Sequence, residues 1–230
     1  MKIFADGAHL AEMMELSRNP LIRGFTTNPT LMRKAGVVDY KKFAHEVLQV
    51  ITDRPISFEV FSDNFSEMER QALEIAAWAE NVYVKIPITN TRGESSTELV
   101  RKLSAAGVKV NVTAILTLEQ VAAVTRSFAA DSIGCISVFA GRIADSGRDP
   151  IPIMVEALRV MRAKPKLELI WASPRELLNI IHADSIGCHI ITVTADILKK
   201  LPLLGKDLTQ YSLDTVKMFH DDAQGSGYSL

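Results

Sequence analysis

Short apolar runs rich in β-branched residues alternate along the whole chain with amphipathic stretches of helical spacing. This alternation is typical of parallel strands joined by helical crossovers. Eight such runs occur, and their starts lie 21 to 33 residues apart, which leaves room for one strand and one helix each. The runs begin near Ile3, Gly24, Ile56, Val82, Lys109, Cys135, Glu168 and His189. Eight units that close on themselves predict an α/β fold, a single (β/α)8 TIM barrel, and 230 residues are close to the shortest length for it.

Five of the intervening stretches show helical spacing, and the last two carry a proline suited to a first turn. The predicted helices span residues 65–78, 95–106, 118–128, 151–162 and 174–183. The sequence Ala-Asp-Ser-Ile-Gly-Cys occurs at 130–135 and again at 183–188, each time where a helix should pass into a strand. We therefore expect Gly134 and Gly187 to end those helices.

The chain is predicted to form one domain with a short addition at its end. Residues 1–207 account for the eight units, and they are expected to form the catalytic barrel. Residues 208–223 show the pattern of one more amphipathic helix, and the stretch from Gln224 to Gly227 predicts a flexible tail. We assign residues 208–230 to the same domain and expect the helix to make a contact in a homo-oligomer.

The composition restricts the class of partner. The chain has 26 basic and 27 acidic residues, so it has no net field that would attract nucleic acid or an anionic membrane. We expect neither partner, and an anionic ligand would have to be met by local charges. The first residues lack the pattern of a signal peptide, and no window approaches the roughly 20 apolar residues of a membrane-spanning helix. A cytoplasmic location is therefore expected.

The cysteines and histidines predict neither a disulfide framework nor a metal site. Cys135 and Cys188 lie in apolar strand-like runs, where small buried thiols are the usual outcome. The five histidines show no metal-ligand spacing. We expect no metal site and no structural disulfide.

Lys85 lies in the apolar strand-like run at residues 82–87, where an ammonium group is costly to bury. A buried amine tends to lose its proton, and a neutral amine is the nucleophile that forms Schiff bases with carbonyl substrates. Two alternatives remain open: the lysine could pair with a nearby carboxylate, or its amine could extend out of the sheet to solvent.

Polar residues end most of the predicted strands, and in a TIM barrel the chemistry lies at these carboxyl ends. The alternation of strand side chains places Ser57 and Glu59 on one face of their strand, and Tyr83 and Lys85 on one face of the next. Both faces can point inward. The polar residues at or just after the strand ends are Asp6, Thr26, Thr27, Asn28, Glu59, Lys85, Asn111, Thr113, Ser137, Arg142, Ser173, Arg175, Thr192 and Thr194.

Some of these residues could have a simpler role as helix caps or turns. Asp6 could cap the helix that begins near Leu10, Asn28 could form a turn before Pro29, and Ser173 could cap a helix that begins at Pro174. Caps do not explain why a carboxylate and an amine occupy inward positions on adjacent strands.

Five motifs within these strand ends resemble those of the transaldolase family, particularly its short branch, which also includes fructose-6-phosphate aldolases. The motifs are residues 24–30 (GFTTNPT), 84–87 (VKIP), 111–113 (NVT), 137–142 (SVFAGR) and 172–175 (ASPR). The likeness runs nearly end to end. It implies a cofactor-free barrel enzyme of carbohydrate metabolism, in the pentose phosphate pathway, that assembles as a pentamer or decamer.

The resemblance also implies a role for each matching residue. By motif position Lys85 forms the Schiff base, Asp6 handles the proton of the substrate hydroxyl, and Glu59 moves protons through a water held by Thr113. The positions that hold the bound three-carbon unit and its surroundings are Thr26, Asn28, Asn111 and Phe139. The positions expected to bind the substrate phosphate are Ser137, Arg142, Ser173 and Arg175.

Two positions separate the branches of the family, and four others depart from its pattern. Fructose-6-phosphate aldolases tend to carry glutamine at the position of Glu59 and tyrosine at that of Phe139, so this chain is more similar to the transaldolases. A phenyl ring cannot orient a water that would protonate the enamine intermediate, which favours transfer over release. The departures are Gly7 and His9 beside the aspartate, and Trp171 and Pro174 near the expected phosphate site.

The expected activity is transfer of a three-carbon dihydroxyacetone unit from a ketose phosphate, such as fructose 6-phosphate or sedoheptulose 7-phosphate, to an aldose phosphate. Three alternatives remain. The chain could be an aldolase that releases free dihydroxyacetone, or a transaldolase for a sugar with another terminal anion. It could also be a barrel that binds sugar phosphates without catalysis, because a fold alone does not fix function.

Overall fold

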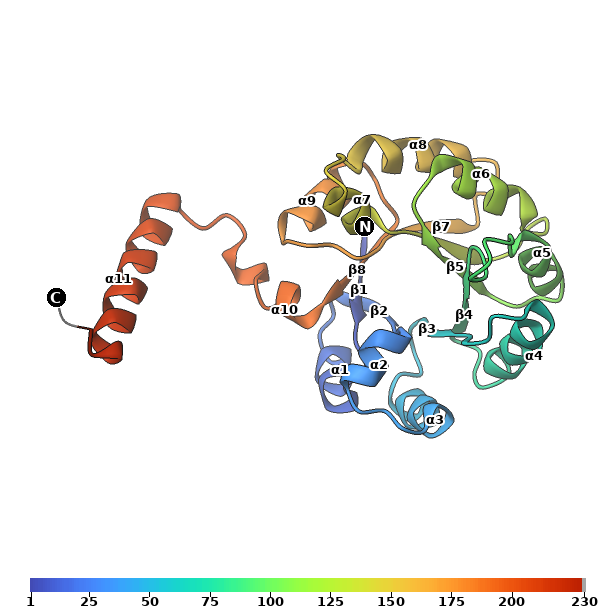
Figure 1. Ribbon diagram of the computed structural model, residues 1–230, viewed down its shortest axis with the longest axis horizontal. Helices are drawn as coiled ribbons and strands as arrows, with labels where there is room; N and C mark the ends of the chain where they lie inside the picture. Colours follow the sequence, from blue (N-terminus) through green and yellow to red (C-terminus); the bar gives the residue numbers. More distant parts are fainter. Residues whose placement is uncertain (229–230) are drawn as a thin grey trace.

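The computed structural model of the chain describes residues 1–228, which form a closed barrel of eight parallel strands with helices around it (Figure 1). The strands follow one another around the barrel in chain order, and β8 pairs with β1 to close it. The prediction of a (β/α)8 barrel is confirmed. The strands are β1 (Lys2–Asp6), β2 (Ile22–Thr26), β3 (Ile56–Glu59), β4 (Val82–Pro87), β5 (Val110–Ile115), β6 (Gly134–Val138), β7 (Leu167–Trp171) and β8 (Ile190–Thr194).

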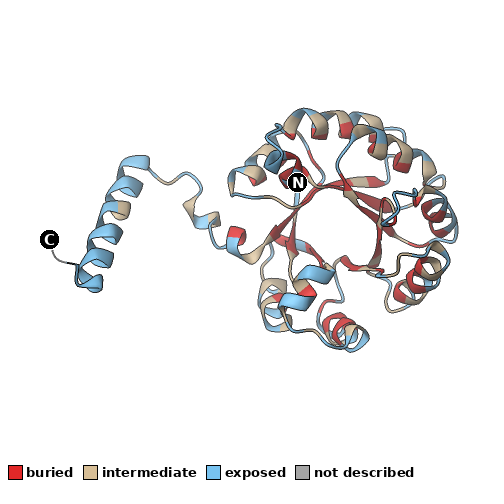
Figure 2. Cartoon of the chain, in the orientation of Figure 1, coloured by how far each residue is buried: buried red, intermediate tan, exposed pale blue. Residues whose placement is uncertain are grey.

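Except for the last one, the helices cover the outside of the barrel with their apolar faces turned inward, so burial is concentrated between these helices and the strands (Figure 2). In α4, for example, Met68, Ala72 and Ile75 recur at helical spacing and are buried. The helices are α1 (Leu10–Ser17), α2 (Pro29–Lys34), α3 (Tyr40–Val50), α4 (Phe65–Ala76), α5 (Thr97–Ala105), α6 (Leu118–Ser127), α7 (Ala140–Asp145), α8 (Ile151–Met161), α9 (Leu178–Ser185), α10 (Ala195–Leu198), the 3-10 turn η1 (Leu201–Leu203) and α11 (Leu208–Ser226).

A small apolar cluster fills the interior of the barrel below its polar end. The ring of Phe4 lies against Gly24, where an added Cβ would meet the ring at 2.5 Å, so only glycine fits this position of β2. Ile170 and Ile190 pack with Phe4 in the same cluster and are fully buried. This cluster supports the layer of polar side chains that lies one step further along each strand.

The start of α9 differs from the prediction. The helix begins at Leu178 rather than at Pro174, because Ser173 adopts a left-handed conformation with φ of 59° and directs the chain away from a helical path. The side-chain oxygen of Asn179 then accepts hydrogen bonds from the N–H groups of Arg175 and Glu176. The segment after β7 is therefore a turn held from within α9.

The two copies of the repeated hexapeptide end their helices differently. Gly187 has φ of 72° and follows α9, as predicted. Gly134 does not end a helix: it is the first residue of β6, and the left-handed residue on that side is Asp131, with φ of 61°. An added Cβ at Gly134 would meet the carbonyl oxygen of Val110 at 2.7 Å, so this glycine is required by close strand packing.

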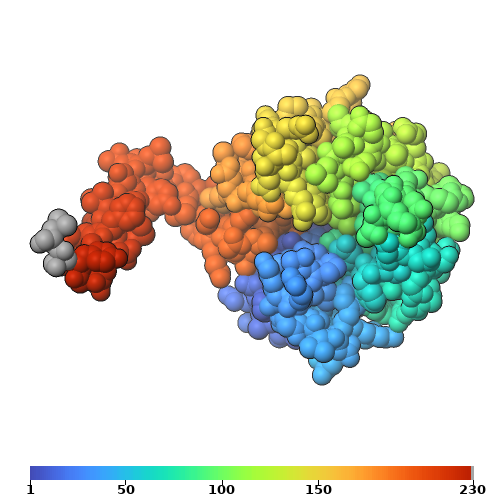
Figure 3. Space-filling view, viewed as in Figure 1, coloured from blue at the N-terminus to red at the C-terminus, as the bar shows by residue number. Residues whose placement is uncertain are grey.

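Helix α11 continues to Ser226, beyond the predicted end at Ala223, and Gly227 ends it in a left-handed conformation. The predicted tail at residues 224–227 is thus mostly helical, and residues 229–230 lie outside the described residues. The helix stands away from the barrel (Figures 1 and 3), and none of its residues is buried. Within residues 1–228, no helix combines the length and apolar character needed to cross a membrane.

Candidate active site

A cavity of about 600 Å³ opens at the carboxyl ends of the strands, where the sequence predicts the chemistry. Eleven of the twelve predicted site residues line it, and Asn111 does not. Of the four departures from the family pattern, Pro174 lines the cavity, whereas Gly7, His9 and Trp171 do not. The predicted residues in the lining are Asp6, Thr26, Asn28, Glu59, Lys85, Thr113, Ser137, Phe139, Arg142, Ser173 and Arg175.

Lys85 lies in the middle of β4 with its amine directed into this cavity and almost out of contact with solvent. Its Nζ is 3.0 Å from the Glu59 carboxylate and donates a hydrogen bond of 2.8 Å to the carbonyl oxygen of Thr27. Glu59 and Lys85 are register partners on adjacent parallel strands, which places both side chains on the inner face. The lysine is therefore buried and also paired with a carboxylate, and its amine does not extend out of the sheet to solvent.

Asp6, at the end of β1, is the second carboxylate of the site. The Thr26 hydroxyl donates to Asp6 Oδ1 at 2.7 Å, and it lies 2.5 Å from the Thr192 hydroxyl. Because Thr26 gives its proton to Asp6, Thr192 must donate to Thr26. Burial raises the pKa of Asp6 above its usual value, whereas the Lys85 charge and the Thr26 hydrogen bond act in the opposite direction.

Thr113 presents a hydroxyl that no other described group uses. Its Oγ1 is buried and has no hydrogen-bond partner among residues 1–228, although the residue lines the cavity. Ala114 follows it with φ of 62°, where the register between β5 and β6 shifts. A hydroxyl buried without a partner is rare, and it is suited to a water or a substrate oxygen in the cavity.

Asn111 lies beneath the cavity rather than at its surface and is fully buried. Its amide donates to the Ser57 hydroxyl at 3.1 Å, and its carbonyl oxygen accepts from the Ser137 hydroxyl at 2.7 Å. In this arrangement the side chain links β3, β5 and β6 and orients Ser137. The structure does not place it in contact with the cavity, where the resemblance implies a substrate-binding residue.

The arginines after β6 and β7 give one end of the cavity a positive charge. The Arg142 guanidinium lies 5.3 Å from the centre of the Phe139 ring, and Arg175 forms a salt bridge of 2.5 Å with Asp145. Hydrogen bonding to Arg175 holds the pKa of Asp145 below its usual value. Two arginines face one carboxylate, Asp145, at this edge, which gives it a local positive charge suited to an anion, whereas the lining carboxylate Asp196 follows β8.

The backbone at this end is fitted closely around Gly141. An added Cβ there would lie 1.6 Å from the carbonyl oxygen of Ser173, so the first turn of α7 can approach the left-handed Ser173 only without a side chain. This contact sets Arg142 and Ser173 at the same edge of the cavity.

Of the two residues Asn28 and Asp6, only Asn28 caps a helix. Asn28 caps α2, because its side-chain oxygen accepts from the Leu31 N–H at 2.9 Å while the residue also lines the cavity. Asp6 caps no helix: His9 is the N-cap residue of α1 and makes no side-chain cap hydrogen bond. Asp6 is therefore free of the structural role that its position could have given it.

The sequence gives no signal for Asp145, and it identifies Thr192 only as a polar residue at a strand end. Thr192 faces inward two residues before Thr194, and strand alternation alone indicates this. Asp145 pairs with Arg175 from a different βα unit, and no local pattern reveals such a partner. Among residues 1–228 no group of three His, Cys, Asp or Glu side chains could hold a metal ion.

Comparison with known proteins gives the same family as the motifs. The sequence model of the family described as Transaldolase/Fructose-6-phosphate aldolase matches residues 3–230. The chain is 31% identical over 218 residues to a probable transaldolase of Dehalococcoides mccartyi, covering 93% of this chain and 97% of that protein. It is 36% identical over 194 residues to a probable transaldolase of Streptococcus agalactiae, covering 84% and 86%. The chain belongs to the transaldolase/fructose-6-phosphate aldolase family.

Solved structures with the same fold are more distant in sequence. The chain resembles 3-hexulose-6-phosphate synthase from Salmonella typhimurium with a TM-score of 0.58 and 15% identity, covering 86% of this chain and 91% of that one. A mandelate oxidase mutant gives a TM-score of 0.57 at 12% identity, covering 84% and 64%. These similarities show the barrel fold alone.

The raised pKa of Asp6 predicts that Asp6→Asn stabilises the protein at neutral pH. A carboxyl whose pKa is raised by folding binds its proton more tightly in the folded state, so ionisation at higher pH weakens folding. Asparagine removes the charge and keeps an oxygen for the Thr26 hydroxyl. Thermal unfolding should show a higher midpoint for the variant at about pH 7, and the gain should fade below about pH 4, where carboxyls are protonated in both states.

Asp53→Asn is the matched control. The hydrogen bond from Arg54 lowers the pKa of the exposed Asp53, so ionisation of this carboxyl favours the folded state instead of weakening it. That variant should be slightly less stable than the wild type at neutral pH. If the unfolding midpoint of Asp6→Asn is lower than that of the wild type at neutral pH, the surroundings of Asp6 do not disfavour its ionised form, and the prediction is wrong.

Proposed function

We propose that the protein is a class I transaldolase that moves a dihydroxyacetone unit from a ketose phosphate to an aldose phosphate through a Schiff base on Lys85. The observation that carries this proposal is the buried Lys85 amine, which faces the cavity beside the Glu59 carboxylate. Membership of the transaldolase/fructose-6-phosphate aldolase family supports the reaction class.

In the proposed cycle, Glu59 takes a proton from Lys85 at a distance of 3.0 Å, and the neutral amine attacks the ketose carbonyl carbon. Loss of water gives the imine, and a water held by the unpartnered Thr113 hydroxyl would carry the protons of this step. Asp6 then accepts the proton of the substrate hydroxyl beside the bond that breaks. The bonding electrons move into the iminium, the aldose leaves, and a three-carbon enamine remains on Lys85.

The fate of that enamine separates transfer from release. Phe139 lines the cavity and carries no hydroxyl that could orient a proton-donating water, and the Arg142 guanidinium covers its ring. We infer that the enamine survives until a second aldose arrives. An aldolase that releases free dihydroxyacetone is the nearest alternative, and the ratio of transferred to released product distinguishes the two.

The proposal predicts that borohydride reduction in the presence of a ketose phosphate traps a donor-derived adduct on Lys85. Lys85→Arg should be inactive and form no adduct, because guanidinium stays protonated and cannot attack a carbonyl. Mass spectrometry of proteolytic peptides locates the adduct. Lys109→Arg is the control: Lys109 donates to the Glu80 carbonyl at the opposite end of the barrel and should not affect trapping. An adduct on another lysine, or turnover without any adduct, would refute the mechanism.

The positive rim predicts that Arg142 and Arg175 bind the terminal phosphate. Charged hydrogen bonds contribute about 1.5 to 3 kcal/mol each, so either alanine variant should lose roughly 10- to 150-fold in kcat/KM for a phosphorylated sugar. Activity on an unphosphorylated substrate such as dihydroxyacetone should change little. Arg148→Ala, an exposed arginine outside the cavity, serves as the control. An equal loss with both substrates would assign the arginines to the structure of the rim, and a preference for another anion would redefine the substrate.

We also propose that the protein is a homo-oligomer and that α11 contacts a second copy. All 19 residues of this helix are at least partly exposed, including Leu208 at 79%, Val216 at 60% and Phe219 at 63%. In proteins, most of the stability of a helix comes from packing of its apolar face against other elements. The helix therefore lacks, within its own chain, the surface that would stabilise it.

The oligomer proposal predicts that paired substitutions Val216→Asp and Phe219→Asp reduce the assembly to smaller species without loss of the barrel. Light scattering coupled to size-exclusion chromatography measures the mass, and circular dichroism checks the fold. Lys217→Asp, on the same helix, is the control for added negative charge and should leave the mass unchanged. A wild-type protein that is monomeric at micromolar concentration would rule out the proposed contact.

A further inference from the structure

The Tyr40 hydroxyl makes two hydrogen bonds to the backbone of a single residue, Glu59. It donates to the Glu59 carbonyl oxygen at 2.8 Å and accepts from the Glu59 N–H at 2.9 Å. Tyr40 is the first residue of α3, and Glu59 is the last residue of β3. One phenol therefore satisfies both backbone groups of the residue whose side chain pairs with Lys85.

These two backbone groups lack a strand partner because β2 ends too early. Strands β2 and β3 pair only from Ile56 to Ser57, and the Thr27 N–H makes the last hydrogen bond, to the Ser57 carbonyl at 3.1 Å. Alternate residues of a strand direct their backbone groups to the same side, so those of Glu59 also face β2. The next residue that could continue this ladder is Pro29, the first residue of α2, and proline has no N–H to donate. The Tyr40 hydroxyl replaces the missing strand.

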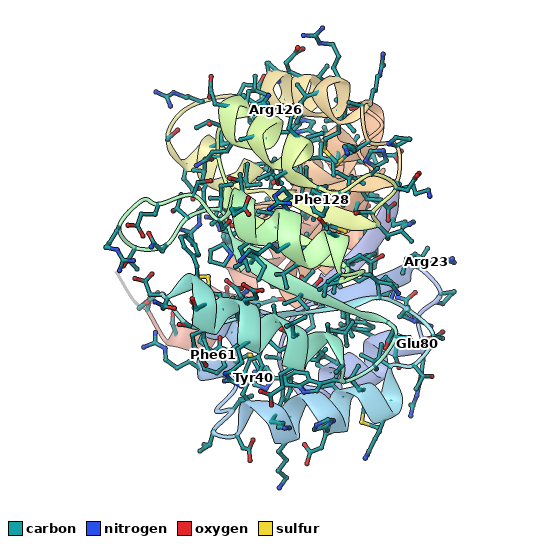
Figure 4. All side chains as sticks on the ribbon, turned by 90° about the vertical axis from the view of Figure 1, so that its right-hand side faces the viewer. Arg23, Tyr40, Phe61, Glu80, Arg126 and Phe128 are labelled. Atoms are coloured by element: carbon teal, nitrogen blue, oxygen red, sulfur yellow. The ribbon has the colours of Figure 1, made fainter. Side chains whose placement is uncertain are left out.

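The ring of Tyr40 is held on three sides. Its centre lies 6.3 Å from that of Phe58, 5.6 Å from that of Phe61 and 5.9 Å from that of Trp78, in edge-on or tilted arrangements. In Figure 4, Tyr40 and Phe61 lie together toward one end of the barrel, away from Glu80 at the other. Burial raises the pKa of Tyr40, so the hydroxyl keeps the proton that it donates.

We propose that Tyr40 is a positioning residue for the active site, because it fixes the end of β3 and thereby keeps the Glu59 carboxylate within 3.0 Å of the Lys85 amine. Tyr40 does not line the cavity, so it acts on the reaction only through Glu59. The inference rests on the proposed function, in which Glu59 moves protons while the imine forms. Without the hydroxyl, the last residue of β3 would have two unpaired backbone groups and no fixed position on its β2 side.

Tyr40→Phe tests the proposal, because it removes one oxygen atom and keeps the ring. The measurement is the rate at which a borohydride-trappable adduct forms on Lys85, by rapid quench with saturating fructose 6-phosphate, expressed per trappable site. We expect a rate about 10-fold lower than in the wild type, the effect of roughly one hydrogen bond. The kcat should fall with this rate while KM changes little, since the anion site belongs to other strands.

Two control variants separate positioning from stability. Tyr83→Phe removes a hydroxyl from a residue that faces the barrel interior on β4 and lies outside the cavity lining. Phe128→Leu weakens core packing against Gly134 and leaves the ring and hydroxyl of Tyr40 unchanged. Both should form the adduct at the wild-type rate, even if their unfolding midpoints fall.

A double-mutant cycle with Glu59→Gln gives the decisive comparison. If Tyr40 acts through the Glu59 carboxylate, Tyr40→Phe should have no further effect on adduct formation in the Glu59→Gln background. The proposal is overturned if Tyr40→Phe slows adduct formation as much in the Glu59→Gln background as in the wild type. It is also overturned if the rates of adduct formation per trappable site in Tyr40→Phe and Tyr83→Phe differ by less than about twofold. A wild-type protein that forms no adduct refutes the proposed function instead. Because the rate is taken per trappable site, partial misfolding of the variant does not affect the outcome.

Discussion

The ion pair between Lys85 and Glu59 is the interaction on which the arrangement of the site depends. The two side chains are 8% and 17% exposed, and an ammonium buried to that extent without a partner would cost several kcal/mol. Register across β3 and β4 places the carboxylate beside the amine, and the Thr27 carbonyl accepts a second hydrogen bond. Both partners reach Lys85 only because three consecutive strands end at the same rim, so the closed barrel makes the burial tolerable.

The charges around this pair suit a covalent step on the lysine. Asp6 and Glu59 face one ammonium, and the excess of carboxylate contributes to the raised pKa of Asp6. An iminium formed on Lys85 would carry the same charge as the ammonium that it replaces, so the two carboxylates would keep their electrostatic partner through the proposed cycle. A carboxyl with a raised pKa is also the stronger base, which suits the removal of a proton from a substrate hydroxyl.

The fold was predictable because its signal is local and repeated. Each predicted strand start lies within two residues of the observed one, since strand alternation and helical spacing are properties of neighbouring residues. The site followed from the same alternation, which turns Glu59 and Lys85 inward without knowledge of their contacts. The later start of α9 follows from the left-handed backbone of Ser173, which the periodic pattern does not show. The position of Asn111 depends on Ser57 and Ser137, which come from other strands. The partners of Tyr40 and Arg175 come from other βα units, and no local pattern specifies them.

The rim of the barrel is also where regular pairing has to end, and the irregular backbone gathers there. Ala114 and Ser173, two of the three non-glycine residues with positive φ in the described chain, line the cavity. Such conformations cost on the order of 1 to 3 kcal/mol each and persist only where the surroundings impose them. Gly141 gives Ser173 the space that it needs, and the Tyr40 hydroxyl satisfies a strand end that β2 leaves unpaired. The apolar layer beneath, built on Phe4, is buried inside the barrel. The burial of this layer stabilises the barrel and offsets the cost of the irregular strand ends above it. Those strand ends can therefore hold the positions that chemistry on Lys85 requires.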